Sequence, residues 1–190
     1  MKHPAASLVL VFALIISMQG AALAEKRAEA SGQKSLAVTQ LEMGNELGRQ
    51  GNFDAAIAAY EKAIAADASI VFAYSNMGYV YEEKGDEDKA IVYFKKATEV
   101  APQDSVAWYD LGAAYTKKRD TQKAVESYEK SFKLDPKSYK SCMSLALAYE
   151  DQRQLDRASE YYVKAMSLTD DPEIKDAIMR QVSRSTPEKV

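Results

Sequence analysis

The chain has 190 residues, enough for one ordinary domain, and a mildly acidic net charge of −3. This acidity argues against a nucleic-acid partner, which would favour a basic stripe. The only histidine is His3 and the only cysteine is Cys142. One cysteine cannot form an internal disulfide, and these two residues cannot supply the usual ligands of a zinc site. We therefore expect no metal and no cofactor.

The first 24 residues predict a secretory signal peptide. Lys2 precedes an apolar run at 8–16, and small residues at 22–24 form an Ala-x-Ala close. The run is short for a membrane span, which needs about 20 residues. We expect cleavage after residue 24 and a periplasmic or secreted protein. A membrane tether is the alternative, if the segment stays uncleaved. Cleavage would also remove His3, so that a histidine-based catalytic triad is impossible in the mature chain.

Residues 25–36 predict a flexible linker, because they are charged and small and contain a Ser-Gly pair. The polar segment 185–190 predicts a disordered tail.

An eight-residue pattern recurs every 34 residues, beginning at residues 40, 74, 108 and 142. Its third occurrence reads WYDLGAAY. The spacing of Trp108, Leu111, Gly112 and Tyr115 places these residues on one face of a helix. A second pattern with spacings of 4 and 3 follows each time and predicts a second amphipathic helix. Its members are Ala56, Tyr60, Ala63, Ala90, Phe94, Ala97, Ala124, Tyr128, Ser131, Ala158, Tyr162 and Ala165.

Turn signals separate the two helices of each unit. Gly51-Asn52 and Gly85-Asp86 stand in the first two units, where Asn and Asp can cap the following helix. Arg119-Asp120 keeps the acid but not the glycine. Arg153-Gln154 keeps neither, so we expect that turn to be less well specified.

A small residue recurs at Gly44, Gly78, Gly112 and Ala146. Glycine inside a helix costs about 1 kcal/mol relative to alanine, so three of them indicate that the paired helices approach closely. Because Ala146 occupies the same place one unit on, we expect the substitution Gly112→Ala to be nearly neutral.

The patterns Trp-x2-Leu-Gly-x2-Tyr and Ala-x3-Phe-x2-Ala, repeated every 34 residues, resemble the tetratricopeptide repeat. The resemblance implies an all-α solenoid, a superhelix of antiparallel helix pairs. Its four units span 37–70, 71–104, 105–138 and 139–172. Residues 173–184 predict a further amphipathic helix, which would cap the last exposed seam.

In the family that this sequence resembles, the opposite face of each first helix lines a concave groove for peptide or helical ligands. The candidate groove residues are Leu41, Asn45, Phe72, Asn76, Tyr79, Tyr109, Met143 and Leu147. Phe72 could instead pack against the previous unit. We expect Tyr79, Tyr109 and Met143 to contact one bound segment.

One subgroup of the family grips a terminal carboxylate with cationic and asparagine side chains. Asn45 and Asn76 fit that pattern. Leu41, Val106 and Asp110 stand where cationic residues would be expected, so we do not predict a carboxylate clamp.

These observations predict a non-enzymatic adaptor or scaffold of the bacterial cell envelope that binds a protein or peptide partner. A self-associating structural module of an envelope complex is the alternative. Acidic pairs such as Glu82-Glu83 are typical of solvated helix ends. The sequence has no glycine-rich phosphate loop and no nucleophile motif. We therefore expect neither catalysis nor a small-molecule substrate.

Overall fold

The computed structural model describes residues 4–185, with side chains at residues 19 and 23 and from 25 to 183. This part of the chain is helical and contains no strand. The helices are α1 (Pro4–Arg49), α2 (Phe53–Ala66), α3 (Val71–Glu83), α4 (Glu87–Val100), α5 (Ser105–Lys117), α6 (Thr121–Leu134), α7 (Tyr139–Asp151), α8 (Leu155–Ser167) and α9 (Pro172–Ser185).

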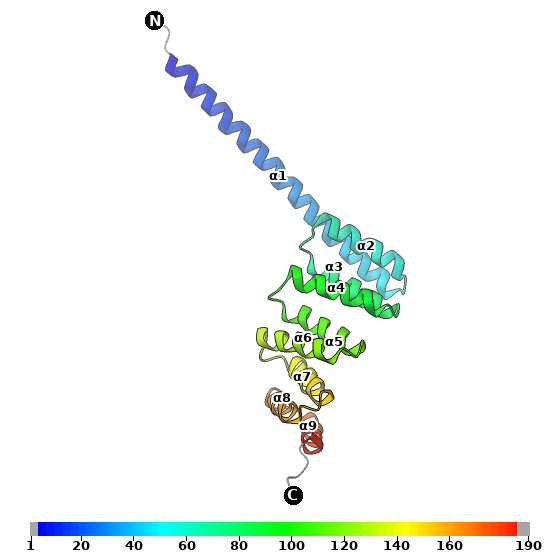
Figure 1. The fold of residues 1–190 in the computed structure, drawn as a ribbon. Coiled ribbons are helices and arrows are strands. Elements are labelled where there is room, and N and C mark those ends of the chain that lie inside the picture. The colour runs from blue at the N-terminus through cyan, green and yellow to red at the C-terminus, as the bar shows by residue number, and fades with distance from the viewer. Residues whose placement is uncertain (1–3, 186–190) are drawn as a thin grey trace.

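The helices stack as antiparallel pairs along one axis (Figure 1). The end of α1 pairs with α2, and the later pairs are α3 with α4, α5 with α6 and α7 with α8. The helices α3, α5 and α7 begin 34 residues apart, at Val71, Ser105 and Tyr139. The predicted all-α solenoid is therefore confirmed, and each helix pair lies within one predicted unit.

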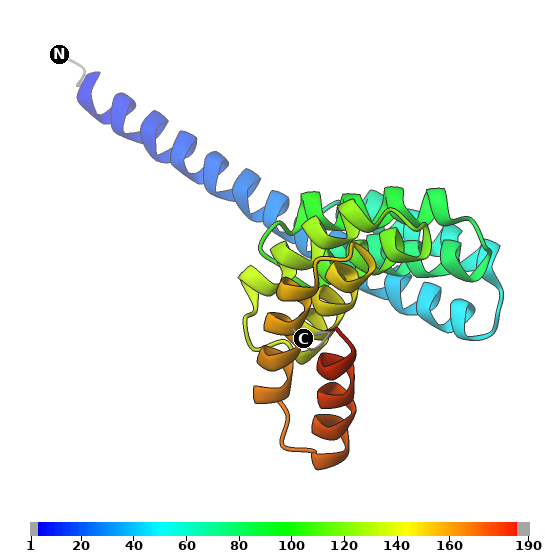
Figure 2. The ribbon, with the colours of Figure 1, turned by 60° about the horizontal axis from the view of Figure 1, so that its bottom comes forward.

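The predicted flexible linker is wrong, because residues 25–36 continue α1 as exposed helix. Most of these residues are good helix formers such as Glu, Lys, Arg and Ala, and Gly32 is the least favourable of them. The N-terminal part of α1 projects from the stacked pairs in both views (Figures 1 and 2). Burial begins at Ala37, the first residue of the first predicted unit.

The predicted signal peptide overlaps the start of α1, and cleavage stays a prediction. Residues 1–3 lie outside the described residues. The predicted disordered tail does too, apart from Ser185, which belongs to α9.

In the first three pairs, an aromatic ring on the second helix lies against the backbone of the first helix. A Cβ atom added to Gly78 would lie 2.7 Å from Cε1 of Phe94, and one added to Gly112 would lie 2.6 Å from Cδ1 of Tyr128. At Gly44 the corresponding distance to Cε1 of Tyr60 is 2.4 Å. The rings leave no space for a methyl group, so the expectation that Gly112→Ala is neutral is wrong.

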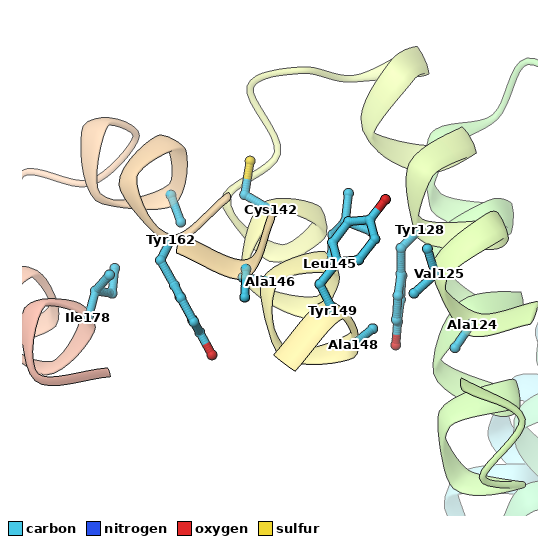
Figure 3. Close-up of a cluster of buried hydrophobic side chains, with 12 residues drawn as sticks. Ala124, Val125, Tyr128, Cys142, Leu145, Ala146, Ala148, Tyr149, Tyr162 and Ile178 are labelled. Carbon is cyan, nitrogen blue, oxygen red and sulfur yellow. The ribbon is translucent and has the colours of Figure 1, made fainter. Parts of the chain in front are cut away.

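The fourth pair accommodates the methyl group that the others exclude. Tyr162 and Ala146 are both fully buried there. Figure 3 shows Tyr162 lying between Ala146 of α7 and Ile178 of α9. Ile178 is also buried, so α9 covers the last seam, as predicted for the capping helix.

The turns share one backbone conformation in spite of their different residues. Gly51 and Gly85 have φ values of 76° and 74°, and Arg119 and Arg153 have 61° and 59°. The turn at Arg153 is thus formed like the others. Asp86 and Asp120 cap α4 and α6 by accepting the backbone N–H of Lys89 and Lys123.

The predicted cap at Asn52 is wrong, because its side chain makes no capping hydrogen bond to α2. The backbone still forms the turn there: the N–H of Ala56 donates to the carbonyl of Asn52.

We expect Gly112→Ala to lower the free energy of unfolding by about 1–3 kcal/mol, because overpacking against Tyr128 outweighs the helix propensity of alanine. The matched control is Gly48→Ala, also in a helix, where the nearest atom to an added Cβ is 3.7 Å away. This control should gain up to about 1 kcal/mol. Urea unfolding measures both. A shift of the same sign in both variants would contradict the close approach.

Candidate protein-binding groove

Three hollows lie along the first helices of the pairs, and we call this row the groove. The first hollow, of about 450 Å³, lies between α1, α2 and α3 and includes Asn45 and Asn76. The second, of about 250 Å³, includes Val106 and Asp110 of α5. The third, of about 530 Å³, lies between α5, α6 and α7 and includes Leu147. Tyr79 lines both the first and the second hollow.

Some of the predicted groove residues present apolar surface to solvent. Phe72 is 64% exposed, so it does not pack into the previous unit. Tyr79 and Leu147 are both nearly half exposed. Val106, the equivalent of Phe72 one unit on, is 60% exposed. These side chains are available to a ligand.

Other predicted groove residues belong partly to the core. Leu41 packs against the buried cluster of the first two units, and Met143 against that of the last two. The Tyr109 ring lies 5.5 Å from the Tyr128 ring. Tyr109 and Met143 are equivalent positions, whereas Tyr79 is equivalent to Leu147. The three residues expected to share one ligand thus do not form a single row.

Asn45 and Asn76 hydrogen-bond to each other across the first hollow. The Asn76 amide donates to the Asn45 carbonyl oxygen at 2.6 Å, and the Tyr60 hydroxyl donates to the same oxygen at 3.0 Å. The two asparagines therefore link successive first helices.

Tyr79 and Asp110 form the corresponding link between α3 and α5. The Tyr79 hydroxyl donates to the Asp110 carboxylate. Burial, with smaller contributions from the charges of Asp104 and Glu82, raises the pKa of Asp110 to about 6, although the hydrogen bond from Tyr79 acts in the opposite direction. Burial and the Asp110 charge raise the pKa of Tyr79 as well.

Asp110 is the functional candidate that sequence reasoning missed. It is 6% exposed and is the one buried charged side chain among the described residues. The sequence marked it only as a place without a cation. The available signal was the contrast with neutral Asn76 and Ser144 at the equivalent positions.

Two further contacts shape the rest of the groove. Lys117 of α5 forms an ion pair with Glu82 of α3 at 2.7 Å. Glu150, at the C-terminal end, accepts hydrogen bonds from Tyr162 and from Gln181 of α9. These acids thus support the packing of the helices.

The side chains that the structure describes contain no group of His, Cys, Asp and Glu arranged to hold a metal ion. Over the same residues, no helical stretch combines the length and hydrophobicity that a membrane span requires.

Models of the tetratricopeptide repeat match residues 41–105, 105–138 and 141–176. A search of curated protein sequences finds no match.

Solved structures of similar fold include the MamA protein, at 22% identity and a TM-score of 0.65 over 79% of this chain and 90% of that one. YrrB, described as a protein of this repeat family with an unusual peptide-binding site, shows 18% identity and a TM-score of 0.64 over 87% and 93%. The first repeat domain of Spaghetti (RPAP3), bound to the HSP90 peptide SRMEEVD, shows 23% identity and a TM-score of 0.58 over 63% and 94%.

We expect Asp110→Asn to stabilise the protein at pH 7.5 by at most about 3 kcal/mol, since one pKa unit corresponds to about 1.4 kcal/mol. The pKa of Asp110 is raised from its ordinary value of 3.8. Its contribution to stability is therefore fully present below pH 4 and is lost as pH rises through 6. The gain from Asp110→Asn should shrink to near zero below pH 4.

Urea unfolding at several pH values measures this difference. The control is Asp176→Asn, which makes the same charge change at an exposed position on α9. A pH-independent difference at Asp110 would show that its carboxyl is not held in a raised-pKa environment.

Proposed function

The chain belongs to the tetratricopeptide repeat family, and on that premise we propose that it is a non-enzymatic adaptor that binds a peptide or helical segment of another protein in its groove. We place this adaptor in the bacterial cell envelope, where it would support the assembly of a complex. Its mechanism is binding alone, through apolar anchors and hydrogen bonds in the groove.

The exposed apolar side chains of the groove are the observation that carries the proposal. Phe72 and Val106 leave most of their surface in solvent, and Tyr79 and Leu147 about half. Val106, Tyr79 and Leu147 line the hollows, and Phe72 is the equivalent of Val106 one unit earlier. Exposed apolar groups beside hollows are typical of binding surfaces. Proteins of similar fold support the same reading, since RPAP3 was solved with an HSP90 peptide and YrrB is described by its peptide-binding site.

The absence of catalysis is supported by the family, whose members generally act as scaffolds. The titratable groups of the groove also have structural partners: Glu82 pairs with Lys117, and Asp110 accepts from Tyr79.

The proposal of an envelope location rests on the N-terminal sequence, with its cationic start, apolar run and Ala-x-Ala close.

We expect the double substitution of Phe72 and Val106 by serine to weaken capture of the partner at least tenfold, because each buried apolar anchor contributes more than about 1 kcal/mol. Helicity should persist, since both side chains are exposed. The measurement is capture of the cross-linked partner segment from envelope extract, quantified against wild type.

The matched control is the substitution of Val92 and Val163 by serine. Both are about half exposed, but they lie on the second helices α4 and α8, whereas Phe72 and Val106 lie on the first helices α3 and α5. If this pair loses capture while the groove pair retains it, the ligand lies on the second-helix side.

We expect the mature protein to begin at Glu25 and to appear in a soluble export fraction. Intact mass spectrometry of the fractionated protein measures this. Full-length protein in the membrane fraction would instead indicate a tethered form.

Self-association is the second candidate, favoured by the exposed apolar side chains of α1. Leu36, Val38 and Met43 are each about half exposed on this helix. Size-exclusion chromatography with light scattering separates the two candidates. A monomer that still captures a partner supports the adaptor, and a concentration-dependent oligomer that captures none supports the structural module.

A further inference from the structure

The second hollow contains a buried carboxyl group that forms no ion pair. Asp110 is 6% exposed, and its hydrogen-bond donor is the neutral Tyr79 hydroxyl. It takes part in none of the ion pairs of the described residues. Lys140, across the hollow on α7, exerts the smallest of the effects on its pKa. A buried carboxylate without a counter-ion is costly.

The fold does not need an acid at this position. The equivalent residues on α3 and α7 are Asn76 and Ser144, and both are neutral. Asn76 still links its helix to the previous one, through Asn45, and the Ser144 hydroxyl donates to Tyr109 at 3.4 Å. An asparagine at residue 110 could accept from Tyr79 in the same way. The negative charge therefore serves something other than the packing of α3 against α5.

The walls of the hollow suit the stem of a long cationic side chain. Tyr79, Tyr109 and Val106 line it, and two of these three present ring surface. Aromatic faces attract ammonium and guanidinium groups, and apolar surface covers the methylene stem of Lys and Arg. Asp135, which follows the end of α6, lines the same hollow and adds a second negative charge, against the single positive charge of Lys140. The volume of about 250 Å³ is several times the ~30 Å³ of a water molecule in the liquid.

We propose that the second hollow holds the Lys or Arg side chain of the bound peptide, with the Asp110 carboxylate as its counter-ion. The inference rests on the proposed function, because the peptide reaches the hollow through the groove. The occupant is a basic side chain of a protein segment. Its charge is opposite to that of the terminal carboxylate that the clamp subgroup of the family binds. The exposed Phe72 and Val106, on the same face, would contact apolar residues of the same segment.

The titratable groups that face Asp110 set the direction of its pH dependence. They are Tyr79 and Glu82 from α3, Asp104 beside α5, Tyr128 from α6, Asp135 beside α6, and Lys140 from α7. The contact of α4 with α5 is made by apolar side chains such as Ala90 and Phe94. Below pH 6 Asp110 takes up a proton, so that a cationic ligand loses its counter-ion.

The test is selection from a display library of peptides randomised at every position, with the mature protein, beginning at Glu25, as bait. Wild type should enrich one basic position, flanked by apolar residues. Asp110→Asn should select peptides without that basic position, and Asp176→Asn, the charge-matched control on α9, should select as wild type does. Enrichment of acidic residues, or a basic position that persists in Asp110→Asn, would overturn the inference.

A selected peptide then permits a double-mutant cycle with norleucine in place of its basic residue, which keeps the stem and removes the charge. Wild type should bind the norleucine peptide at least tenfold more weakly, whereas Asp110→Asn should bind both peptides alike. The affinity of wild type for the basic peptide should fall about tenfold for each pH unit below 6. An equal loss of affinity in both proteins would overturn the role of Asp110.

The outcomes separate this inference from the proposed function. If wild type selects no peptide, both fail. If the selected peptides depend on Phe72 and Val106 but carry no basic position, the adaptor stands and the inference about Asp110 fails.

Discussion

The contact between a second-helix ring and the first-helix backbone is the constraint on which the rest of the structure depends. Because Gly44, Gly78 and Gly112 have no side chain, the rings of Tyr60, Phe94 and Tyr128 lie directly on the helix. This contact fixes the distance within each pair, and the pairs then repeat at constant spacing. It also connects the core to the groove, since the same rings extend to the groove side.

The hydroxyl groups of these rings show the connection. Tyr60 donates to Asn45, the hydroxyl of Tyr128 lies 3.2 Å from that of Thr116, and Tyr162 donates to Glu150. Tyr60 and Tyr128 line the first and the third hollow. Phe94 has no hydroxyl, and there the Tyr79 ring packs edge-on against it at 5.1 Å. In the first and third pairs, the side chain that closes the core therefore also shapes the floor of the groove.

A repeated surface contact holds the second helix against the first helix in the last three pairs. A cation lies over the Tyr ring at 5.1 Å for Lys89 and Tyr81, at 5.4 Å for Lys123 and Tyr115, and at 5.3 Å for Arg157 and Tyr149. Such contacts contribute about 0.5–1 kcal/mol each at exposed sites. The first unit has Leu47 and Ala55 at these positions and lacks the contact, which leaves its pair more dependent on the core.

The periodicity predicted the fold because it records the packing that every unit shares. The same reasoning missed features that depend on one neighbour. The segment 25–36 looked flexible from its composition. It nevertheless continues α1, whose later part, from Ala37 onward, is stabilised by packing against α2. A helical projection places Tyr109 and Met143 on the helix faces that line the groove. It does not show that the Tyr128 ring lies beside Tyr109. The sequence marked Asp110 only as a place without a cation, because its burial depends on another unit, which contributes Tyr79.

These differences also explain how the groove can vary while the spacing stays constant. In a solenoid each unit contacts only its neighbours, so a local cost in one unit need not be compensated throughout the chain. The link between successive first helices is Asn45 with Asn76, then Tyr79 with Asp110, then Tyr109 with Ser144. The first and third links are neutral, and only the middle one contains a carboxylate. The ring contacts hold the helices in place whichever link is present. The middle unit can therefore hold a destabilising charge that the fold does not use, and a ligand cation is what would stabilise it.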